Sequence, residues 1–260
     1  MAQLFLNGQS LGPIDGVLFD KDGTLSHSEP KLLALVRQRI STAERLWQEK
    51  SGDKPSSTAD RPYQLQTLLE QVYGVQGDAI HPAGTLAVAA RQDNLASMAT
   101  VFCLMGSGWP EALALATRCF AEDQSEPGPA SALLPGADRV LQQCRQAKVC
   151  TAIISNDTAD GINRFLEQHQ LCEQISDCWS ADDTPRKPDP QAVLSLCERL
   201  QLLPERCALI GDADTDLEMA KAAGIGVVLG YRGGWRQPAP LTTTPHLFDD
   251  WSAVTITVGP

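Results

Sequence analysis

Short apolar runs that end in polar residues recur along the chain and predict the strands of a sheet that is buried on both faces. Such runs occupy residues 14–19, 149–154, 207–210 and 226–229. Segments with helical spacing accompany them at 136–147, 158–169, 190–201 and 215–223. Gly224 is placed to cap the last of these helices at its C-terminal end. Strands that alternate with helices indicate a doubly wound α/β sheet, in which ligands bind beyond the carboxyl ends of the strands.

A long segment between the first two of these strands breaks the alternation. It carries helical patterns without a convincing strand, around 30–50, 62–73, 85–105 and 110–121. Turn-forming residues lie inside it at 51–55, and those at 126–129 and 135–136 mark the return to the sheet. The sequence therefore predicts an α/β core from residues 1–27 and 131–260, with an inserted helical domain from residues 28–130.

Composition and charge narrow the classes of partner. With 260 residues and 43% apolar residues, the chain can bury a substantial core. A formal net charge of -11 opposes sequence-independent attraction to nucleic acid or to an anionic membrane, so neither is expected as a partner. An anionic substrate would need a locally positive site.

Cysteine usage and the absence of export signals predict a cytoplasmic protein. The eight cysteines are scattered without a C-x-x-C pair or histidines at metal spacing, as expected for reduced thiols. Residues 1–10 lack the basic start and apolar core of a signal peptide. The longest apolar stretch, 95–105, is shorter than the roughly 20 residues that a membrane span needs.

The most informative motif follows the first predicted strand, where residues 20–25 read D-K-D-G-T-L. Asp20 and Asp22 can share one small site, one acting as nucleophile while the other gives a proton to the leaving oxygen and takes one from water. Gly23 allows a tight turn beside them. An acidic turn that caps a helix is the alternative for this hexapeptide alone.

Two later positions offer groups for a phosphoryl oxygen. Ser155, with Asn156 beside it, ends the second predicted strand and presents a hydroxyl and backbone donors, although a turn serine is the common alternative. Lys187 precedes Pro188, which disfavours helical geometry at the lysine, and Asp189-Pro190 can start the next helix. A lysine held there can neutralise phosphate charge, whereas most lysines are solvated at the surface.

Carboxylates gather again after the third predicted strand, where residues 211–216 read G-D-A-D-T-D. Oxygen ligands of this kind suit a hard cation. Asp212 stands at the strand end and is the better metal ligand. For Asp214 and Glu218 we favour the alternative, that they are acids placed near a helix N-terminus by its dipole.

Taken in order, these motifs resemble the haloacid dehalogenase (HAD) superfamily, whose phosphatases carry D-x-D-G-T-L, then Ser or Thr, then Lys, then G-D-x-x-x-D. The four motifs extend from Asp20 to Asp216. The resemblance implies a Rossmann-like, doubly wound parallel sheet with an all-α cap inserted between the first and second motifs. The cap is expected to shield the site from water and to select the substrate.

The resemblance also implies a role for each acidic residue. Asp20 would be the nucleophile and a ligand of Mg²⁺, and Asp22 the acid/base and a ligand through its carbonyl oxygen. Asp212 would be a further metal ligand, and Asp216 would orient the metal shell. Strict metal dependence is expected, because a carboxylate approaches a phosphate dianion only if positive charge offsets the repulsion.

The positive and polar residues complete the implied site. Ser155, Asn156 and Lys187 would bind the phosphoryl group. The chain is most similar to phosphoglycolate phosphatase-like members, in which D-G-T-L is commonly followed by x-D-S. Here Ser26-His27-Ser28 follows, so a histidine replaces that aspartate, and phosphoglycolate is not assigned as the substrate. His27 would either contact substrate or face solvent. Lys21 stands where the family usually has an apolar residue.

The sequence thus predicts a Mg²⁺-dependent phosphatase that hydrolyses a small phosphorylated metabolite through an aspartyl-phosphate. A phosphomutase is the nearest alternative, because it uses the same nucleophile and differs in the phosphoryl acceptor. A haloacid dehalogenase needs no metal and generally lacks the second aspartate, so Asp22 argues against it. A non-catalytic binding protein that retains the fold is the alternative from another class. The sequence makes no prediction of oligomeric state.

Overall fold

The computed structural model describes residues 1–51, 61–122 and 130–259. The chain divides into two compact units, one formed by Met1–Ser28 with Ala130–Pro260 and the other by Glu29–Pro129. Of the turn-rich stretches predicted from the sequence, residues 52–55 and 126–129 lie outside the described residues. We describe each unit by itself.

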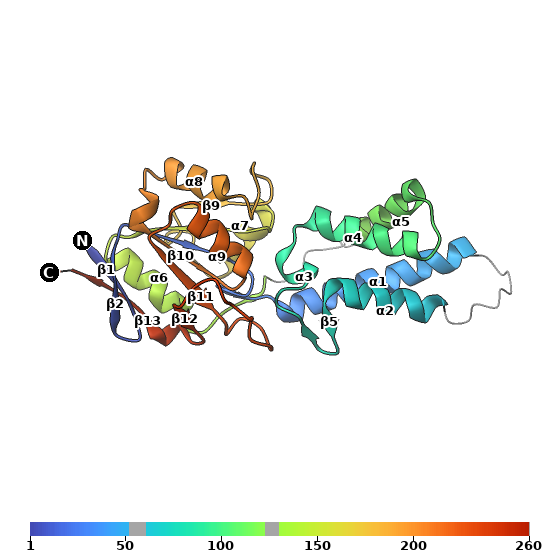
Figure 1. Ribbon diagram of the computed structural model, residues 1–260, viewed down its shortest axis with the longest axis horizontal. Helices are drawn as coiled ribbons and strands as arrows, with labels where there is room; N and C mark the ends of the chain where they lie inside the picture. Colours follow the sequence, from blue (N-terminus) through green and yellow to red (C-terminus); the bar gives the residue numbers. More distant parts are fainter. Residues whose placement is uncertain (52–60, 123–129, 260) are drawn as a thin grey trace. The chain divides into compact units, whose positions relative to one another are not determined.

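A six-stranded sheet forms the centre of the first unit (Figure 1). Its order is β12-β11-β10-β3-β8-β9, and every neighbouring pair is parallel. The strands are β3 (Gly16–Phe19), β8 (Cys150–Ile154), β9 (Asp177–Trp179), β10 (Cys207–Gly211), β11 (Val227–Tyr231) and β12 (Leu247–Phe248). Four of them correspond to the apolar runs read from the sequence.

Helices cover both faces of this sheet. Alternate strand residues point to opposite sides, so both faces carry apolar side chains that the helices bury. Val17 and Phe19 belong to one apolar cluster and Leu18 to another. Apolar residues of α6 (Ala137–Gln146) and α7 (Ala159–Gln168) pack in the first cluster, and those of α8 (Pro190–Arg199) and α9 (Asp214–Ala222) in the second (Figure 1). The predicted doubly wound α/β fold is confirmed.

Local signals in the sequence account for several element ends. Asp189 caps α8 by accepting a hydrogen bond from the backbone N–H of Gln191 at 2.8 Å, and Pro190 starts the helix. Gly224 follows the end of α9 with a φ of 76°, a conformation that glycine adopts without strain. Two 3₁₀ turns, Pro204–Arg206 and Trp251–Ala253, precede strands.

A second, antiparallel sheet joins the two ends of the described chain. It consists of β1 (Ala2–Leu6) between β2 (Gln9–Ile14) and β13 (Val254–Val258). The turn between β1 and β2 is Asn7-Gly8, with positive φ at both residues, which is the geometry favoured in two-residue hairpins. Ile14 belongs to this hairpin, so the predicted strand 14–19 is divided at Asp15.

The first unit holds its two crossing segments next to each other. The short strands β4 (Ser26–His27) and β7 (Ala132–Leu133) pair antiparallel, with Ser26 opposite Leu133. They lie directly before and after the residues of the second unit along the chain. The points at which the chain leaves and rejoins the α/β unit are therefore neighbours.

The second unit is mainly helical. Its helices are α1 (Glu29–Ser51), α2 (Arg61–Tyr73), α3 (Thr85–Val88), α4 (Arg91–Leu104) and α5 (Trp109–Glu122). In its core, Trp47 stacks on Phe102 with ring centroids 5.9 Å apart. The unit also contains a hairpin of β5 (Val75–Gln76) and β6 (Ala79–Ile80), which the sequence pattern did not indicate. The helix predicted at 85–105 is interrupted at Ala89 and Ala90.

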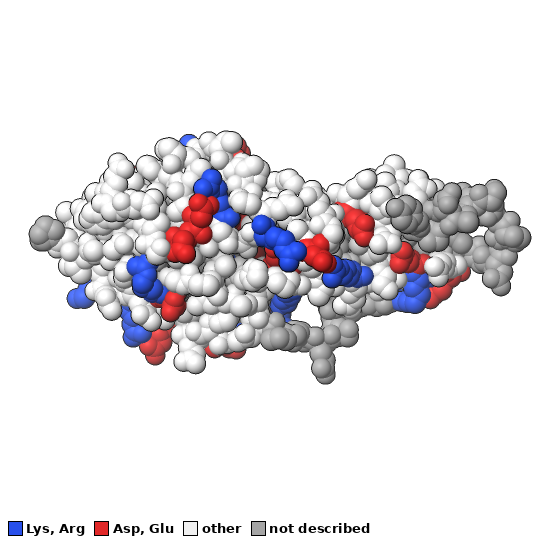
Figure 2. All heavy atoms as spheres, turned by 90° about the horizontal axis from the view of Figure 1, so that it is seen from below, with Lys and Arg blue, Asp and Glu red and all other residues white. Residues whose placement is uncertain are grey.

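The surface carries charges of both signs side by side, as Figure 2 shows for one face. Arg45 pairs with Glu49 at 2.7 Å, and Arg145 pairs with Glu173 at 3.1 Å. Exposed pairs of this kind each contribute at most about 1 kcal/mol to stability. Within the described parts of the chain, no helix combines the length and the apolarity needed to cross a bilayer.

Candidate active site

Three neighbouring parallel strands bring the predicted motifs to one edge of the sheet. β3 lies between β10 and β8, and the three strands end just before Asp20, Asp212 and Ser155. Asp20 continues the ladder, because its N–H donates to the carbonyl of Ile210 at 2.9 Å. Residues that are far apart along the chain therefore meet beyond the carboxyl ends of the strands, as the sequence predicted.

Asp20, Asp212 and Asp216 form a buried acidic cluster. Each has an oxygen within 4.8 Å of an oxygen of the other two, and all three residues are buried. Asp216 reaches the cluster from the first turn of α9, where Gly211 leaves room for its side chain. Among the described residues, Oδ2 of Asp20 is buried without a hydrogen-bond partner. An orphaned buried oxygen is costly unless a ligand satisfies it.

Lys187 is the positive group in this cluster. Its Nζ lies 2.6 Å from Oδ1 of Asp20 and 2.9 Å from Oδ1 of Asp216, and it donates to the carbonyl of Ile154 at 3.3 Å. Burial alone would lower the pKa of Lys187, but the charges of the two aspartates raise it above its ordinary value. The lysine is only 9% exposed, so the solvated alternative considered for it is wrong.

The charge balance of the cluster fits a hard divalent cation. Three carboxylates face one ammonium group, so two negative charges are left over when all are ionised. Burial raises the pKa of Asp20 to about 6, against the opposing effect of Lys187. Burial and the charges of Asp20 and Asp216 raise the pKa of Asp212 well above its usual range. A cation bound by these oxygens would relieve both effects.

Asp22 belongs to a different group of contacts. Its Oδ1 lies 2.6 Å from Nζ of Lys21 and accepts a hydrogen bond from the hydroxyl of Ser28. Lys21 is buried and also contacts Oδ2 of Asp157 at 3.1 Å. Burial alone would raise the pKa of Asp22, but Lys21 and Ser28 lower it below its ordinary value. The carboxylate of Asp22 is not part of the acidic cluster.

A tight turn places the two aspartates in these separate surroundings. The carbonyl of Lys21 accepts from the N–H groups of Leu25 at 3.0 Å and Ser26 at 2.8 Å. Gly23 has a φ of 81°, which a residue with a side chain rarely adopts. The turn predicted from D-K-D-G-T-L is therefore present and is closed by its own backbone.

The remaining predicted residues lie close to this edge. Ser155 is buried, and its hydroxyl accepts a hydrogen bond from the N–H of Asp157 at 3.1 Å. Ser155 directly follows Ile154, whose carbonyl accepts from Lys187. Asn156 is half-buried in the same turn. Their role as phosphate ligands stays a prediction.

Residues that the sequence set apart from the site are held by other contacts. Asp214 accepts hydrogen bonds from the N–H groups of Thr242 and Thr243, and it is not part of the acidic cluster. His27 is exposed, in agreement with the solvent-facing alternative.

A family model described as haloacid dehalogenase-like hydrolase matches residues 14–224. The chain belongs to this family. The matched segment contains every residue that the sequence assigned to the site. The resemblance read from the motifs is thereby confirmed.

Curated relatives of this HAD-like hydrolase include phosphoglycolate phosphatases. One, from Vibrio cholerae, is 34% identical over 130 residues, which is 48% of this chain and 58% of that protein. Another, from Rhodospirillum rubrum, is 24% identical over 239 residues, which is 92% of this chain and 88% of that protein. The Vibrio alignment therefore spans less than two thirds of its relative.

A solved structure shows the same fold. It is a predicted phosphoglycolate phosphatase from Haemophilus somnus, with a TM-score of 0.63 and 17% identity, covering 92% of this chain and 95% of that one. At this identity the likeness concerns the fold alone.

Two residues that sequence reasoning missed contact Asp212 in this HAD-like hydrolase. Oδ1 of Asp212 accepts from the hydroxyl of Thr24 at 3.0 Å, and Oδ2 accepts from the indole N–H of Trp235 at 2.5 Å. Thr24 lies within the D-K-D-G-T-L motif. The Gly-Gly-Trp run at 233–235, shortly after the strand β11, was the available signal for the second contact.

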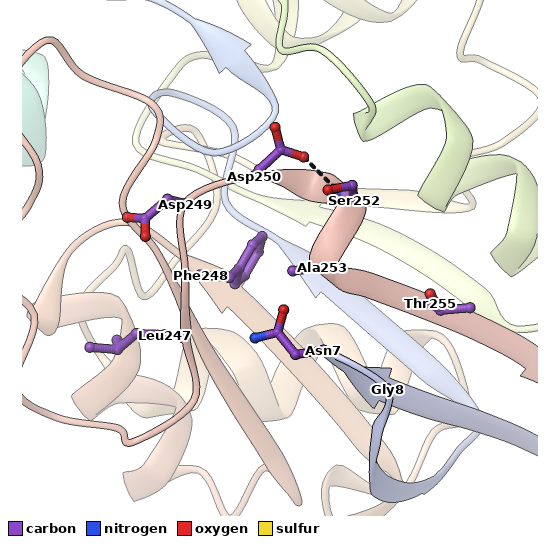
Figure 3. Close-up of a pocket in the computed structure, with 9 residues that line it drawn as sticks. All are labelled: Asn7, Gly8, Leu247, Phe248, Asp249, Asp250, Ser252, Ala253 and Thr255. Carbon is purple, nitrogen blue, oxygen red and sulfur yellow. Dashed lines mark hydrogen bonds between the residues drawn. The ribbon is translucent and has the colours of Figure 1, made fainter.

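A hollow elsewhere in the α/β unit is less suited to a phosphorylated ligand. It has a volume of about 450 Å³ and is lined by nine residues from the Asn7-Gly8 turn and from residues 247–255 (Figure 3). No lysine, arginine or histidine is among the nine. Figure 3 shows Asp250 pointing toward Ser252, whose N–H it binds at 2.7 Å. The acidic cluster with its lysine is therefore the better candidate for an active site.

Proposed function

We propose that this HAD-like hydrolase is a Mg²⁺-dependent phosphatase that hydrolyses a small phosphomonoester through an aspartyl-phosphate on Asp20. The observation that carries the proposal is the state of the Asp20 carboxylate. One oxygen is bound to Lys187, and the other is buried without a partner among the described residues, within a cluster of three carboxylates. Such a carboxylate can attack phosphorus and can bind a cation such as Mg²⁺.

The proposed first step forms a bond between a carboxylate oxygen of Asp20 and phosphorus while the ester P–O bond breaks. Asp22, which must first take up a proton because its pKa is lowered in the metal-free chain, gives that proton to the departing oxygen. In the second step water attacks phosphorus, Asp22 takes a proton from that water, and the bond to Asp20 breaks. Asp20 and Asp22 are regenerated, and the products are an alcohol and inorganic phosphate.

The charges of the phosphoryl group are met by this chain's own residues. Lys187 stabilises negative charge on the phosphoryl oxygens, with Ser155 and Asn156 as further donors. Asp20, Asp212 and the carbonyl of Asp22 would hold Mg²⁺, and Asp216 would orient that shell. When bound, the cation supplies the positive charge that lets a carboxylate approach a phosphate dianion.

The relatives and the sequence support a choice of substrates to test. The relatives named above are phosphoglycolate phosphatases, so phosphoglycolate is the first substrate to test. Because His27 replaces the aspartate common in that subfamily, other small phosphorylated metabolites belong in the same screen. We propose that residues 28–130 form the cap that selects among these substrates. We also propose a cytoplasmic location.

The test is phosphate release from a panel of phosphorylated metabolites, with Mg²⁺ or with EDTA. We expect turnover only with Mg²⁺, and a loss of at least about 10⁴-fold in Asp20→Asn, as for the removal of a catalytic nucleophile. Asp214→Asn is the matched control, since Asp214 lies in a predicted motif but outside the acidic cluster. It should retain nearly full turnover.

Product analysis separates the alternatives. Transfer of phosphate to a second position of a sugar phosphate, without release, would indicate a phosphomutase. Halide release that survives EDTA would indicate a dehalogenase. Absence of turnover on the whole panel, with no aspartyl-phosphate mimic formed by beryllium fluoride, would overturn the assignment as an enzyme of this type.

A further inference from the structure

We propose that Trp235 is a positioning residue whose indole N–H holds the carboxylate of Asp212 in the orientation that binds the divalent cation. This inference deepens the proposed function and rests on it, because the cation is the one that the phosphatase would use. Trp235 does not touch the reacting atoms in this proposal. It acts through Asp212.

The contact joins two buried groups from neighbouring strands. Asp212 follows β10, and Trp235 lies in the segment after β11, the parallel neighbour of β10. Trp235 is 5% exposed and Asp212 is 3% exposed. The indole nitrogen lies 2.5 Å from Oδ2 of Asp212, so the donor points at a carboxylate that water does not reach. A hydrogen bond to a buried charged group is stronger than one between neutral groups.

Two glycines bring the segment of Trp235 directly against the D-K-D-G-T-L loop. A Cβ atom on Gly234 would lie 1.7 Å from the carbonyl oxygen of Gly23. A Cβ atom on Gly23 would lie 2.4 Å from both the indole nitrogen of Trp235 and Oδ2 of Asp212. Any side chain at either glycine would push the indole away from the carboxylate. The absence of a side chain at both glycines therefore allows the indole N–H of Trp235 to reach the carboxylate of Asp212.

Trp235 and Thr24 together fix both oxygens of the Asp212 carboxylate. Thr24 donates to Oδ1 and Trp235 to Oδ2. A carboxylate oxygen has two lone pairs, so each oxygen keeps one for a cation after accepting one hydrogen bond. The two donors come from different loops, and this prevents rotation of the carboxylate in either direction.

The chemistry of the indole suits this position better than that of a charged donor. An indole has an N–H donor and no acceptor, and it carries no charge. A lysine or arginine in its place would neutralise Asp212 and compete with the cation. Trp235 thus orients the ligand without reducing the negative charge of the cluster. Partners that orient metal ligands typically change metal affinity by about 10-fold to 100-fold when they are removed.

The test is Mg²⁺ binding to Trp235→Phe, which keeps an aromatic ring and removes the N–H. Isothermal titration calorimetry measures binding without turnover. We expect the dissociation constant of Mg²⁺ to rise about 10-fold, and the Mg²⁺ concentration for half-maximal phosphate release to rise in parallel. Rates at saturating Mg²⁺ should change less than the affinity.

Trp179→Phe is the matched control. Trp179 is also buried, but its indole N–H donates to the backbone carbonyl of Pro185 at 2.8 Å. The Mg²⁺ affinity of the Trp179→Phe variant should equal that of the wild type. If Trp235→Phe binds Mg²⁺ as the wild type does, or if both variants lose affinity equally, the role of Trp235 is disproved while the proposed function stands. A wild type that neither binds Mg²⁺ nor turns over substrate would overturn both.

A measurement on the unaltered protein covers the case in which Trp235→Phe does not fold. The chain has five tryptophans, and ¹⁵N-tryptophan labelling makes their indole N–H groups visible by NMR. Mg²⁺ should shift at least one indole signal, because one indole donates to a metal ligand. If none of the signals moves while calorimetry shows binding, the inference is overturned.

Discussion

Two buried lysines, Lys187 and Lys21, each contact two carboxylates, but the two groups differ in what they leave unsatisfied. Lys187 contacts Asp20 and Asp216 in a cluster that contains a third buried carboxylate. One oxygen of Asp20 has no partner among the described residues. This group therefore has an excess of negative charge, which bound protons or an added cation can offset.

The group around Lys21 has a smaller excess of negative charge, because two carboxylates face its one ammonium group. Lys21 contacts Asp22 and Asp157, and Ser28 donates to the same oxygen of Asp22. The side chain of Asp157 is 34% exposed, so water shares in compensating its charge. Among the described residues, no third carboxylate joins Asp22 and Asp157 in a cluster.

The comparison explains why two aspartates two positions apart differ in acidity. The pKa of Asp20 is raised to about 6 by burial, and the pKa of Asp22 is lowered because Lys21 and Ser28 outweigh burial. Incomplete compensation indicates a group that receives ligands. Fuller compensation, as around Lys21, indicates a group that holds one side chain in place.

Among the changes that test the comparison of the two lysines, Lys187→Met has the largest expected effect, a loss of turnover. Removing a preorganised positive group that stabilises a developing oxyanion typically costs about 10²-fold to 10³-fold in kcat. We expect a loss of this size, measured as steady-state phosphate release at saturating Mg²⁺. Circular dichroism checks folding, and Lys187→Arg, which keeps the charge, should recover part of the rate. A rate equal to that of the wild type would show that the cluster does not bind the phosphoryl group.

The second effect is on the pH dependence of the free energy of unfolding, because the pKa values of Asp20 and Asp22 are shifted in opposite directions. Because Asp20 has a pKa of about 6 in the folded state and 3.8 as its ordinary value, the metal-free folded state binds more protons than the unfolded state between these values. Its contribution to the free energy of unfolding therefore falls as the pH rises through this window. For Asp22 the sign is reversed, since a lowered pKa adds stability above the ordinary value and loses it as the pH falls.

Thermal unfolding with and without Mg²⁺ checks this prediction. A cation that binds only the folded state adds about 2.7 kcal/mol at a concentration 100 times its Kd. The cation competes with protons for Asp20 and Asp212, so the rise in Tm on adding Mg²⁺ should be larger at pH 7.5 than at pH 5. An equal rise at both pH values would place the cation elsewhere.

The smallest of the three effects is expected for Lys21→Met. In the proposed mechanism Lys21 and Ser28 hold Asp22 for proton transfer, and Lys21→Met removes one of these two contacts. We expect a fall of about 10-fold in kcat for an alkyl phosphate, less than the roughly 10²-fold or more that a positioned proton donor typically contributes, because Asp22 itself remains. Turnover of p-nitrophenyl phosphate should fall much less, because nitrophenolate departs without a proton. Equal losses on both substrates would show that Lys21 supports the fold and not the proton transfer.

Local sequence signals were enough to predict four of the six strands of the central sheet and the edge where the acidic cluster lies. Buried parallel strands produce apolar runs, and their carboxyl ends meet, so the positions of Asp20 and Asp212 followed from pattern and order. Lys187 was harder, since a lysine before Pro188 reads equally well as a surface residue. Its burial depends on carboxylates that only the fold brings to it.

Contacts that join distant segments were beyond the sequence pattern. The antiparallel sheet of β1, β2 and β13 pairs the first residues with the last, and no local period indicates such pairing. β9 and β12 are too short, at three and two residues, to show a period of two. The bonds of Trp235 to Asp212 and of Lys21 to Asp157 depend on how loops from different strands pack.

The pairing of β4 with β7 bears on how a chain with so large an insertion can fold. Once Ser26 and Leu133 are opposite each other, the two halves of the α/β unit are tethered as if a short hairpin joined them. The entropic penalty for closing a loop rises only with the logarithm of its length, so the intervening hundred or so residues add little to it. The length of the inserted segment could then vary through evolution with small effect on the assembly of the parallel sheet.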